Sequence, residues 1–218
     1  MRPDACNPAR GAGRVPAPRL PWLCLALAGL AGVLHLLPGV RELLVWDRGA
    51  LEAGELWRLA SGHWVHWSDT HLAWDLATFG LLGAACELRS RRSFVACVGL
   101  SGLGIALALW AWQPGLVACA GLSGIDCALF AWLAFDLVRE RWCDGRLAAA
   151  LVLAGFCSAF AAKLAFELNT GAALFVSDLG PGVVPVPAAH LVGALAGIAV
   201  ALSSSPLVPA APRRFASA

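Results

Sequence analysis

Long apolar runs separated by short polar stretches make up most of this chain of 218 residues. Each run approaches the roughly 20 residues that a helix needs to cross the hydrocarbon core of a bilayer. The runs cover residues 21–37, 71–87, 93–112, 123–138, 147–166 and 188–202. The pattern therefore predicts an all-α membrane protein with six transmembrane helices.

Polar segments divide the chain into one membrane domain and two tails. Residues 1–20 and 205–218 are polar or proline-rich, and we expect both tails to be cytoplasmic, with the membrane domain at 21–204. Two long loops are expected, at 38–70 and 167–187. The chain is 59% hydrophobic and 14% charged, whereas a soluble domain carries roughly 25% charged residues. The net charge of +2 gives no support for nucleic-acid binding.

The positive charges gather on one side of the predicted helices. Lys and Arg are enriched in cytoplasmic loops of membrane proteins. Of the 16 basic residues, 12 fall on the side of the tails. They are Arg2, Arg10, Arg14, Arg19, Arg89, Arg91, Arg92, Arg139, Arg141, Arg146, Arg213 and Arg214. This asymmetry predicts six spans with both termini in the cytoplasm.

That orientation brings three chemically capable residues to the outer face. The second, fourth and sixth spans begin there, and their first residues include His71, Ser123 and His190. A serine hydroxyl is a weak nucleophile and needs a base within hydrogen-bond reach. A neutral imidazole that titrates near pH 7 can act as that base. The sequence predicts that Ser123 and His190 form a catalytic pair inside the membrane.

Small residues provide a way for the fourth and sixth helices to touch. His190, Gly193 and Gly197 share one helix face, and Gly124 with Ala128 forms a matching small stripe. Small residues at this spacing let two membrane helices approach closely. We expect the two stripes to face each other and to bring Ser123 and His190 together.

The fourth run is short, which affects the expected depth of Ser123. From Ser123 to Val138 a helix extends about 24 Å, less than the ~30 Å hydrocarbon core. We therefore expect Ser123 below the outer surface, after irregular backbone that lines a water-filled cavity. The first N–H groups of this helix and the His71 side chain are candidate oxyanion donors. Asp75 lies one turn after His71, where a carboxylate would repel an oxyanion unless protonated.

Other interpretations of these residues stay open. Ser123 is also a candidate N-cap, with Asp126 as the acidic residue of a capping box. The tetrapeptide Gly-Leu-Ser-Gly occurs a second time at 99–102, mid-span, where we interpret Ser101 as a packing residue. Lys163 and Glu167 are expected to form an i,i+4 ion pair. Cys and His do not fall at ligand spacing, so a metal site is not expected.

Four elements of the chain resemble the rhomboid intramembrane serine proteases, over nearly all of residues 21–204. They are Trp57-Arg58, His66 with His71 and Asp75, Gly121-Leu122-Ser123-Gly124, and Ala189-His190 with Gly193 and Gly197. The resemblance implies a six-helix bundle with Ser123 as nucleophile and His190 as base. It also implies that His71 and the Ser123 backbone N–H form the oxyanion hole. Asp75 departs from the family, which usually has Asn there.

The compact six-span form, the loop at 51–66 and the Gly-Leu-Ser-Gly variant look most like the rhombosortase branch. This resemblance implies a bacterial inner-membrane enzyme with its active site toward the periplasmic side. Its substrates would be membrane-anchored proteins with a Gly-Gly C-terminal sorting tail, and no cofactor is implied. The alternative is a non-catalytic rhomboid-like protein that binds membrane clients. A small transporter is less favoured, because the chain lacks an inverted-repeat signature.

Overall fold

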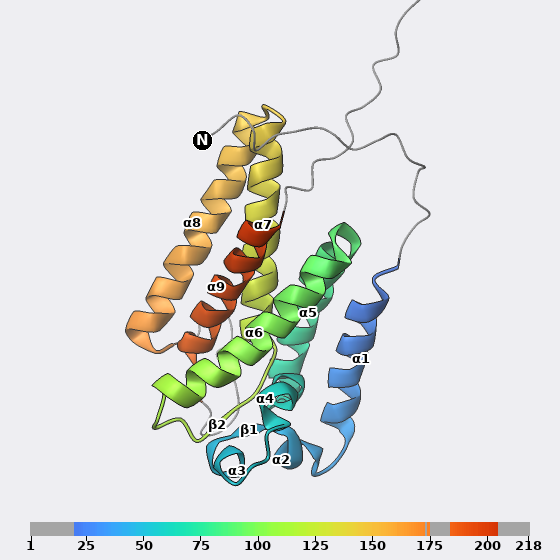
Figure 1. The fold of residues 1–218 in the computed structure, drawn as a ribbon, viewed down its shortest axis with the longest axis vertical. Helices are drawn as coiled ribbons and strands as arrows, with labels where there is room; N and C mark the ends of the chain where they lie inside the picture. Colours follow the sequence, from blue (N-terminus) through green and yellow to red (C-terminus); the bar gives the residue numbers. More distant parts are fainter. Residues whose placement is uncertain (1–19, 173, 175–183, 205–218) are drawn as a thin grey trace, which may run out of the picture.

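The computed structural model describes residues 20–172, 174 and 184–204. Apart from Leu20, the predicted tails at 1–20 and 205–218 lie outside these residues. Most of the described chain is helical, and each apolar run folds as one long helix (Figure 1). These helices are α1 (Trp22–Leu36), α5 (Asp69–Arg89), α6 (Arg91–Trp112), α7 (Ser123–Cys143), α8 (Leu147–Thr170) and α9 (Pro187–Ser203).

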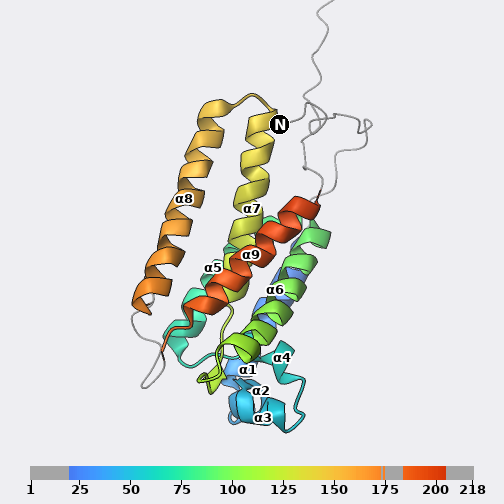
Figure 2. The same cartoon turned by 60° about the vertical axis from the view of Figure 1, so that its left-hand side comes forward.

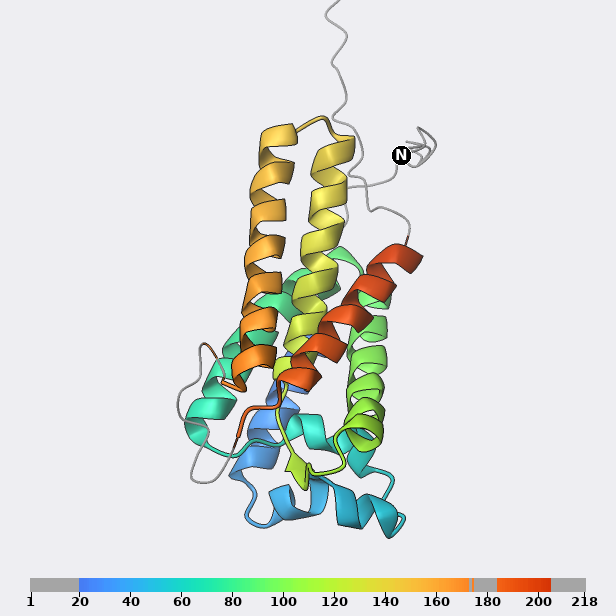
Figure 3. The same ribbon diagram turned by 90° about the vertical axis from the view of Figure 1, so that its left-hand side faces the viewer.

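Successive long helices run in alternating directions, so α5, α7 and α9 all begin at the same end of the bundle (Figures 1 and 3). Helix α7 contacts α5, α6, α8 and α9 and is the central helix of the described bundle. Helix α9 crosses obliquely between α7 and α6 (Figure 2). The arrangement gathers the starts of α5 and α9 around the start of α7.

Glycines allow α7 and α9 to pack backbone against backbone. A Cβ atom at Gly193 would lie 1.9 Å from the carbonyl oxygen of Gly124. A Cβ atom at Gly197 would lie 2.1 Å from the carbonyl oxygen of Ala128. No side chain larger than hydrogen fits at either distance, so this contact depends on both glycines.

Helix α8 lies at one edge of the bundle and leaves apolar side chains uncovered (Figure 1). Leu151, Val152 and Phe156 are each at least 60% exposed, as expected for residues that face lipid. Among the described residues, α6 and α8 are long and apolar enough to cross a membrane, whereas the apolar helices α1 and α9 are shorter. The count of six spans therefore stays a prediction.

The segment between α1 and α5 is more structured than the predicted loop at 38–70. It contains α2 (Val40–Leu44), β1 (Trp46–Asp47), α3 (Arg48–Glu52), α4 (Arg58–Ser61) and the 3₁₀ turn η2 (Gly62–Trp64). Strand β1 pairs antiparallel with β2 (Ala118–Cys119) in the segment before α7. These elements are too short to give a periodic pattern, so the sequence did not reveal them.

One buried arginine holds this segment together. The Arg58 guanidinium donates to the carbonyl oxygens of Glu42 and Val45, each at 2.9 Å, and pairs with Glu55 at 2.7 Å. Arg48 donates to the last carbonyl groups of α6, including Leu109 at 3.1 Å. Hydrogen bonds to charged groups are among the stronger ones in proteins. The segment is therefore fastened to the end of the bundle where α7 begins.

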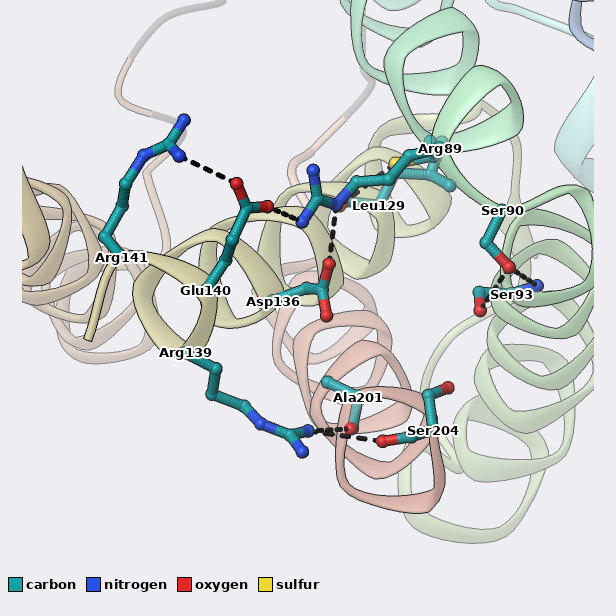
Figure 4. Close-up of polar contacts among 11 residues, drawn as sticks. Arg89, Ser90, Ser93, Leu129, Asp136, Arg139, Glu140, Arg141, Ala201 and Ser204 are labelled. Carbon is teal, nitrogen blue, oxygen red and sulfur yellow. Dashed lines mark hydrogen bonds and ion pairs between the residues drawn. The ribbon is translucent and has the colours of Figure 1, made fainter. Parts of the chain in front are cut away.

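The predicted end of the fourth helix, at Val138, is wrong. Helix α7 continues to Cys143 because its last turns are held by ion pairs rather than by apolar contacts (Figure 4). Arg89 pairs with both Asp136 and Glu140, and Glu140 also pairs with Arg141. A helix of this length spans about 30 Å, close to the hydrocarbon core. Because the added turns carry Arg139, Glu140 and Arg141, the apolar part of the helix is not lengthened, and the depth of Ser123 below the outer surface stays a prediction.

Candidate active site

Ser123 is the first helical residue of α7, and Leu122 occupies the N-cap position. The alternative of Ser123 as N-cap is therefore wrong, and no side chain caps this helix. Gly121 turns the chain into the helix with a φ of 112°, a left-handed conformation that favours glycine. The Ser123 hydroxyl therefore lies at a helix N-terminus, where it is partly buried.

His190 lies in the first turn of α9, directly opposite Ser123. Its Nε2 atom is 2.9 Å from the Ser123 Oγ atom, a hydrogen-bonding distance. The backbone contact of Gly193 with Gly124 lies one turn after His190 on α9 and one residue after Ser123 on α7. Residues 67 positions apart in sequence thus meet because α7 and α9 pack closely at their starting ends.

The other ring nitrogen of His190 faces a residue whose part in this site the sequence did not reveal. The Nδ1 atom lies 2.8 Å from Oε2 of Glu167, which is only 1% exposed. The predicted pair of Lys163 with Glu167 is present at 2.8 Å. A buried carboxylate in an apolar helix was the available signal, but the i,i+4 lysine offered a sufficient explanation for it.

A second group of polar contacts near Ser123 is centred on Asp75, which accepts hydrogen bonds. Its Oδ2 atom lies 2.7 Å from the Leu122 backbone nitrogen, 3.1 Å from His66 Nε2 and 3.3 Å from His71 Nε2. Burial lowers the pKa of the His66 imidazole, so His66 is neutral near pH 7. Asp75 thus fastens the residue before Ser123 to the start of α5.

Gly121 lies between the start of α7 and the side chains of His71 and Asp75. A Cβ atom at this position would lie 2.7 Å from His71 Nε2 and 2.9 Å from Asp75 Oδ2. The imidazole of His71 and the carboxylate of Asp75 therefore pack directly against the turn that leads into Ser123. The structure thus places His190 beside Ser123 and places His71 with Asp75 beside Gly121, two residues before Ser123.

The second Gly-Leu-Ser-Gly is part of the interior of α6. Ser101 is fully buried, and its hydroxyl donates to the Cys97 carbonyl oxygen at 2.5 Å. This is a bond back to the preceding turn of the same helix, which is common for serine inside helices. Both hydrogen bonds of the Ser101 hydroxyl go to carbonyl oxygens of α6, those of Cys97 and Val98, in agreement with its interpretation as a packing residue.

The Ser123 hydroxyl, the His190 imidazole and the Glu167 carboxylate lie side by side next to a helix N-terminus. The first backbone N–H groups of a helix have no partner within the helix, and they carry the positive end of its dipole. Within the described residues, no group of three or more His, Cys, Asp or Glu side chains is arranged to hold a metal ion. The chemistry that these groups support is nucleophilic attack by a serine with stabilisation of a developing negative charge.

Comparison with known families gives the fold and the site a context. The Rhomboid domain matches residues 53–206, from α4 through the end of α9. Helix α1 precedes the matched region. No curated protein matches the chain. Rhomboid proteins are integral membrane proteins, generally intramembrane serine proteases, with some inactive members. Because this match covers well over half of the chain, the chain belongs to the rhomboid family.

Proposed function

We propose that this protein is an intramembrane serine endopeptidase in which Ser123 is the nucleophile and His190 the general base. The observation that carries the proposal is the 2.9 Å contact between Ser123 Oγ and His190 Nε2. Inactive relatives that lack the serine or the histidine would lack this contact. The surrounding Glu167 and Asp75 are buried and make polar contacts, so the pair lies within an organised polar site rather than in apolar packing.

The reaction follows from this geometry. His190 Nε2 takes the proton of Ser123 Oγ as the oxygen attacks the carbonyl carbon of the scissile peptide bond. The protonated imidazole then gives that proton to the leaving amide nitrogen, and the C–N bond breaks. Water, activated by the same imidazole, hydrolyses the acyl-enzyme and restores the serine hydroxyl. Each proton moves over one hydrogen bond.

The oxyanion of the tetrahedral intermediate needs donors beside Ser123. The Ser123 backbone N–H, at the first position of α7, and the His71 side chain are the proposed donors. Asp75 is proposed to support this site by fixing the His71 ring and the Leu122 N–H rather than by contacting the oxyanion. Gly121 is proposed to provide the turn that allows this packing.

We also propose that six helices cross a bacterial inner membrane, with both termini in the cytoplasm and the site toward the periplasm. The alternating directions of the long helices and the positive charges at one end support this topology. The substrates are proposed to be membrane-anchored proteins with a Gly-Gly C-terminal sorting tail, in the manner of rhombosortases. The support for this specificity is the Gly-Leu-Ser-Gly variant and the compact domain.

The decisive experiment compares the two serines of the duplicated tetrapeptide. The full-length protein is co-expressed with a membrane-anchored reporter whose tail carries Gly-Gly, an apolar segment and a basic end. We expect Ser123→Ala to abolish reporter cleavage, whereas Ser101→Ala keeps at least about half of it, because Ser101 bonds only within its own helix. Immunoblots of the reporter measure both.

Each possible result has a definite meaning. Reporter cleavage that persists in Ser123→Ala would reject the assignment of the nucleophile. Labelling of Ser123 by a fluorophosphonate without reporter cleavage would reject the Gly-Gly specificity and keep the serine hydrolase. If the wild-type protein neither cleaves the reporter nor reacts with the fluorophosphonate, the non-catalytic client-binding alternative replaces the proposal.

A further inference from the structure

Both ring nitrogens of His190 have a partner within hydrogen-bond reach. Nε2 faces the Ser123 hydroxyl at 2.9 Å, and Nδ1 faces Oε2 of Glu167 at 2.8 Å. A neutral imidazole carries one proton, so one of these nitrogens is a donor and the other an acceptor. The identity of the group at Nδ1 therefore decides whether Nε2 is free to take a proton from Ser123.

A carboxylate at Nδ1 selects the tautomer that a base needs. An ionised carboxylate only accepts hydrogen bonds, so Nδ1 must carry the proton when it faces Glu167. The lone pair then lies on Nε2, toward Ser123. When Nε2 accepts the serine proton, the negative charge of Glu167 stabilises the imidazolium. The carboxylate of a Ser-His-Asp triad acts in this way.

Lys163 is the competing partner for Nδ1, and the distances decide between the two. Its Nζ atom lies 3.5 Å from His190 Nδ1, compared with 2.8 Å for the carboxylate oxygen. An ammonium only donates, so a dominant contact with Lys163 would impose the opposite tautomer. Lys163 instead lies 2.8 Å from the same Glu167 oxygen and balances the buried charge.

Glu167 is fixed in this position by further contacts. Its second oxygen, Oε1, accepts from the Leu174 backbone N–H at 3.1 Å, just beyond the end of α8. The residue is 1% exposed, and the side chains of Lys163 and His190 are 15% and 12% exposed. A buried carboxylate with both oxygens engaged keeps one rotamer, so it holds the imidazole plane as well as its tautomer.

We propose that Glu167 is a positioning residue that completes a Ser123–His190–Glu167 triad. This inference rests on the proposed function, because it concerns the base of that same reaction. It assigns to the end of α8 a part in the chemistry that goes beyond the ion pair between Lys163 and Glu167 within that helix. Lys163 has a secondary part, which is to make the buried carboxylate tolerable.

The test measures the reaction of the purified full-length protein with a fluorophosphonate probe, which does not require a known substrate. In this reaction the Ser123 oxygen bonds to phosphorus, the P–F bond breaks, fluoride leaves and His190 takes the proton. Varying the probe concentration separates the maximal rate of labelling from the concentration that gives half of that rate. Thermal unfolding in detergent micelles is followed for each variant.

Three variants separate tautomer control from packing. In Glu167→Gln the amide can turn an N–H toward Nδ1, so we expect the maximal labelling rate to fall by about 100-fold or more. The half-saturating probe concentration should change less than about threefold. Glu167→Asp keeps a carboxylate, so its maximal labelling rate should be at least about tenfold higher than that of Glu167→Gln. Lys163→Gln removes the ion pair but leaves the carboxylate, and should lose less than about fivefold.

The outcomes distinguish the two proposals. If labelling is the same in the wild type and in Ser123→Ala, the proposed function fails, and this inference fails with it. If Ser123→Ala abolishes labelling while Glu167→Gln keeps more than a third of the maximal rate, only the triad is overturned. Equal losses in Glu167→Gln, Glu167→Asp and Lys163→Gln would also overturn it, because they would indicate a structural ion pair. Should Glu167→Gln fail to fold, the contrast between Glu167→Asp and Lys163→Gln decides alone.

Discussion

The tetrapeptide Gly-Leu-Ser-Gly folds in two different ways within this chain. At 99–102 it is four consecutive residues in the middle of α6. At 121–124 it covers a left-handed glycine, an N-cap and the first two residues of α7. The first serine bonds back to its own helix, and the second faces a histidine of another helix. The same four residues form part of a helix interior in one place and a helix start that faces His190 in the other.

The leucines of the two copies also lie in opposite environments. Leu100 is 56% exposed on the outside of the bundle, whereas Leu122 is completely buried beside Ser123. The position of each copy relative to a helix start determines this difference. Inside a helix the four residues point in four directions, so the tetrapeptide has no common environment. At a helix start the chain can turn, and neighbouring elements can then close around it.

The largest expected difference between the copies concerns their first glycine. In Gly121→Ala the new Cβ atom would meet the His71 ring at 2.7 Å and would require a left-handed backbone, a conformation that costs an alanine about 1–2 kcal/mol. We expect fluorophosphonate labelling of Ser123 to fall by more than about 100-fold, because the turn and His71 must both move.

Gly99→Ala is the matched control. Nothing lies within 4 Å of a Cβ atom at Gly99, and alanine is favoured over glycine inside a helix by about 1 kcal/mol. We expect unchanged labelling and equal or higher thermal stability. Equal behaviour of the two alanine variants would show that the turn at Gly121 is not needed for the site.

A smaller difference is expected between the two leucines. Removing a buried leucine side chain costs about 2–5 kcal/mol in a well-packed interior. Leu122→Ala should lower the free energy of unfolding by an amount in this range, because Leu122 packs in the main core with Phe79 and Trp132. Leu100→Ala should change it by less than about 1 kcal/mol. Thermal and denaturant unfolding of both variants in the same micelles measure the contrast, and a reversed order would contradict the burial argument.

The apolar pattern predicted the six long helices well, since a run of lipid-compatible residues leaves few alternatives to a helix. It located their starts within about two residues, including the start of α7 at Ser123. The pattern could not locate the end of α7, because Asp136 and Glu140 form ion pairs with Arg89 of α5, and Arg139 donates to the Ala201 carbonyl oxygen of α9. Apolar periodicity carries no information about such partners.

The sequence predicted only part of the candidate site, again because it does not reveal contacts between distant helices. Ser123 and His190 stood out because each lies at a helix start among small residues, and small residues indicate where helices approach. Glu167 did not stand out, because its nearest cationic partner, Lys163, is on the same helix. The role of Asp75 depended on the Leu122 N–H, 47 positions away, which no local spacing reveals. Contacts between distant elements, rather than local motifs, were the missing information.

The smallest expected difference concerns the last glycine of each copy. A Cβ atom in Gly124→Ala would lie 2.6 Å from the end of the Ile105 side chain and 3.0 Å from the Ala189 carbonyl oxygen. The isoleucine can turn aside, but the carbonyl belongs to the residue before His190 and has little freedom. We expect α9 to shift by a few tenths of an ångström and labelling of Ser123 to fall by about three- to tenfold, with only a small loss of stability.

Gly102→Ala supplies the comparison, because the nearest atoms to its Cβ belong to His63 at 3.4 and 3.6 Å, an ordinary contact. Alanine should therefore be accepted in α6 with full labelling and unchanged or slightly raised thermal stability. Together with the other two pairs, this comparison tests whether sensitivity follows the position in the helix rather than the identity of the residue. Equal losses of labelling in Gly102→Ala and Gly124→Ala would mean that general helix packing, and not the spacing between Ser123 and His190, sets the reactivity of the serine.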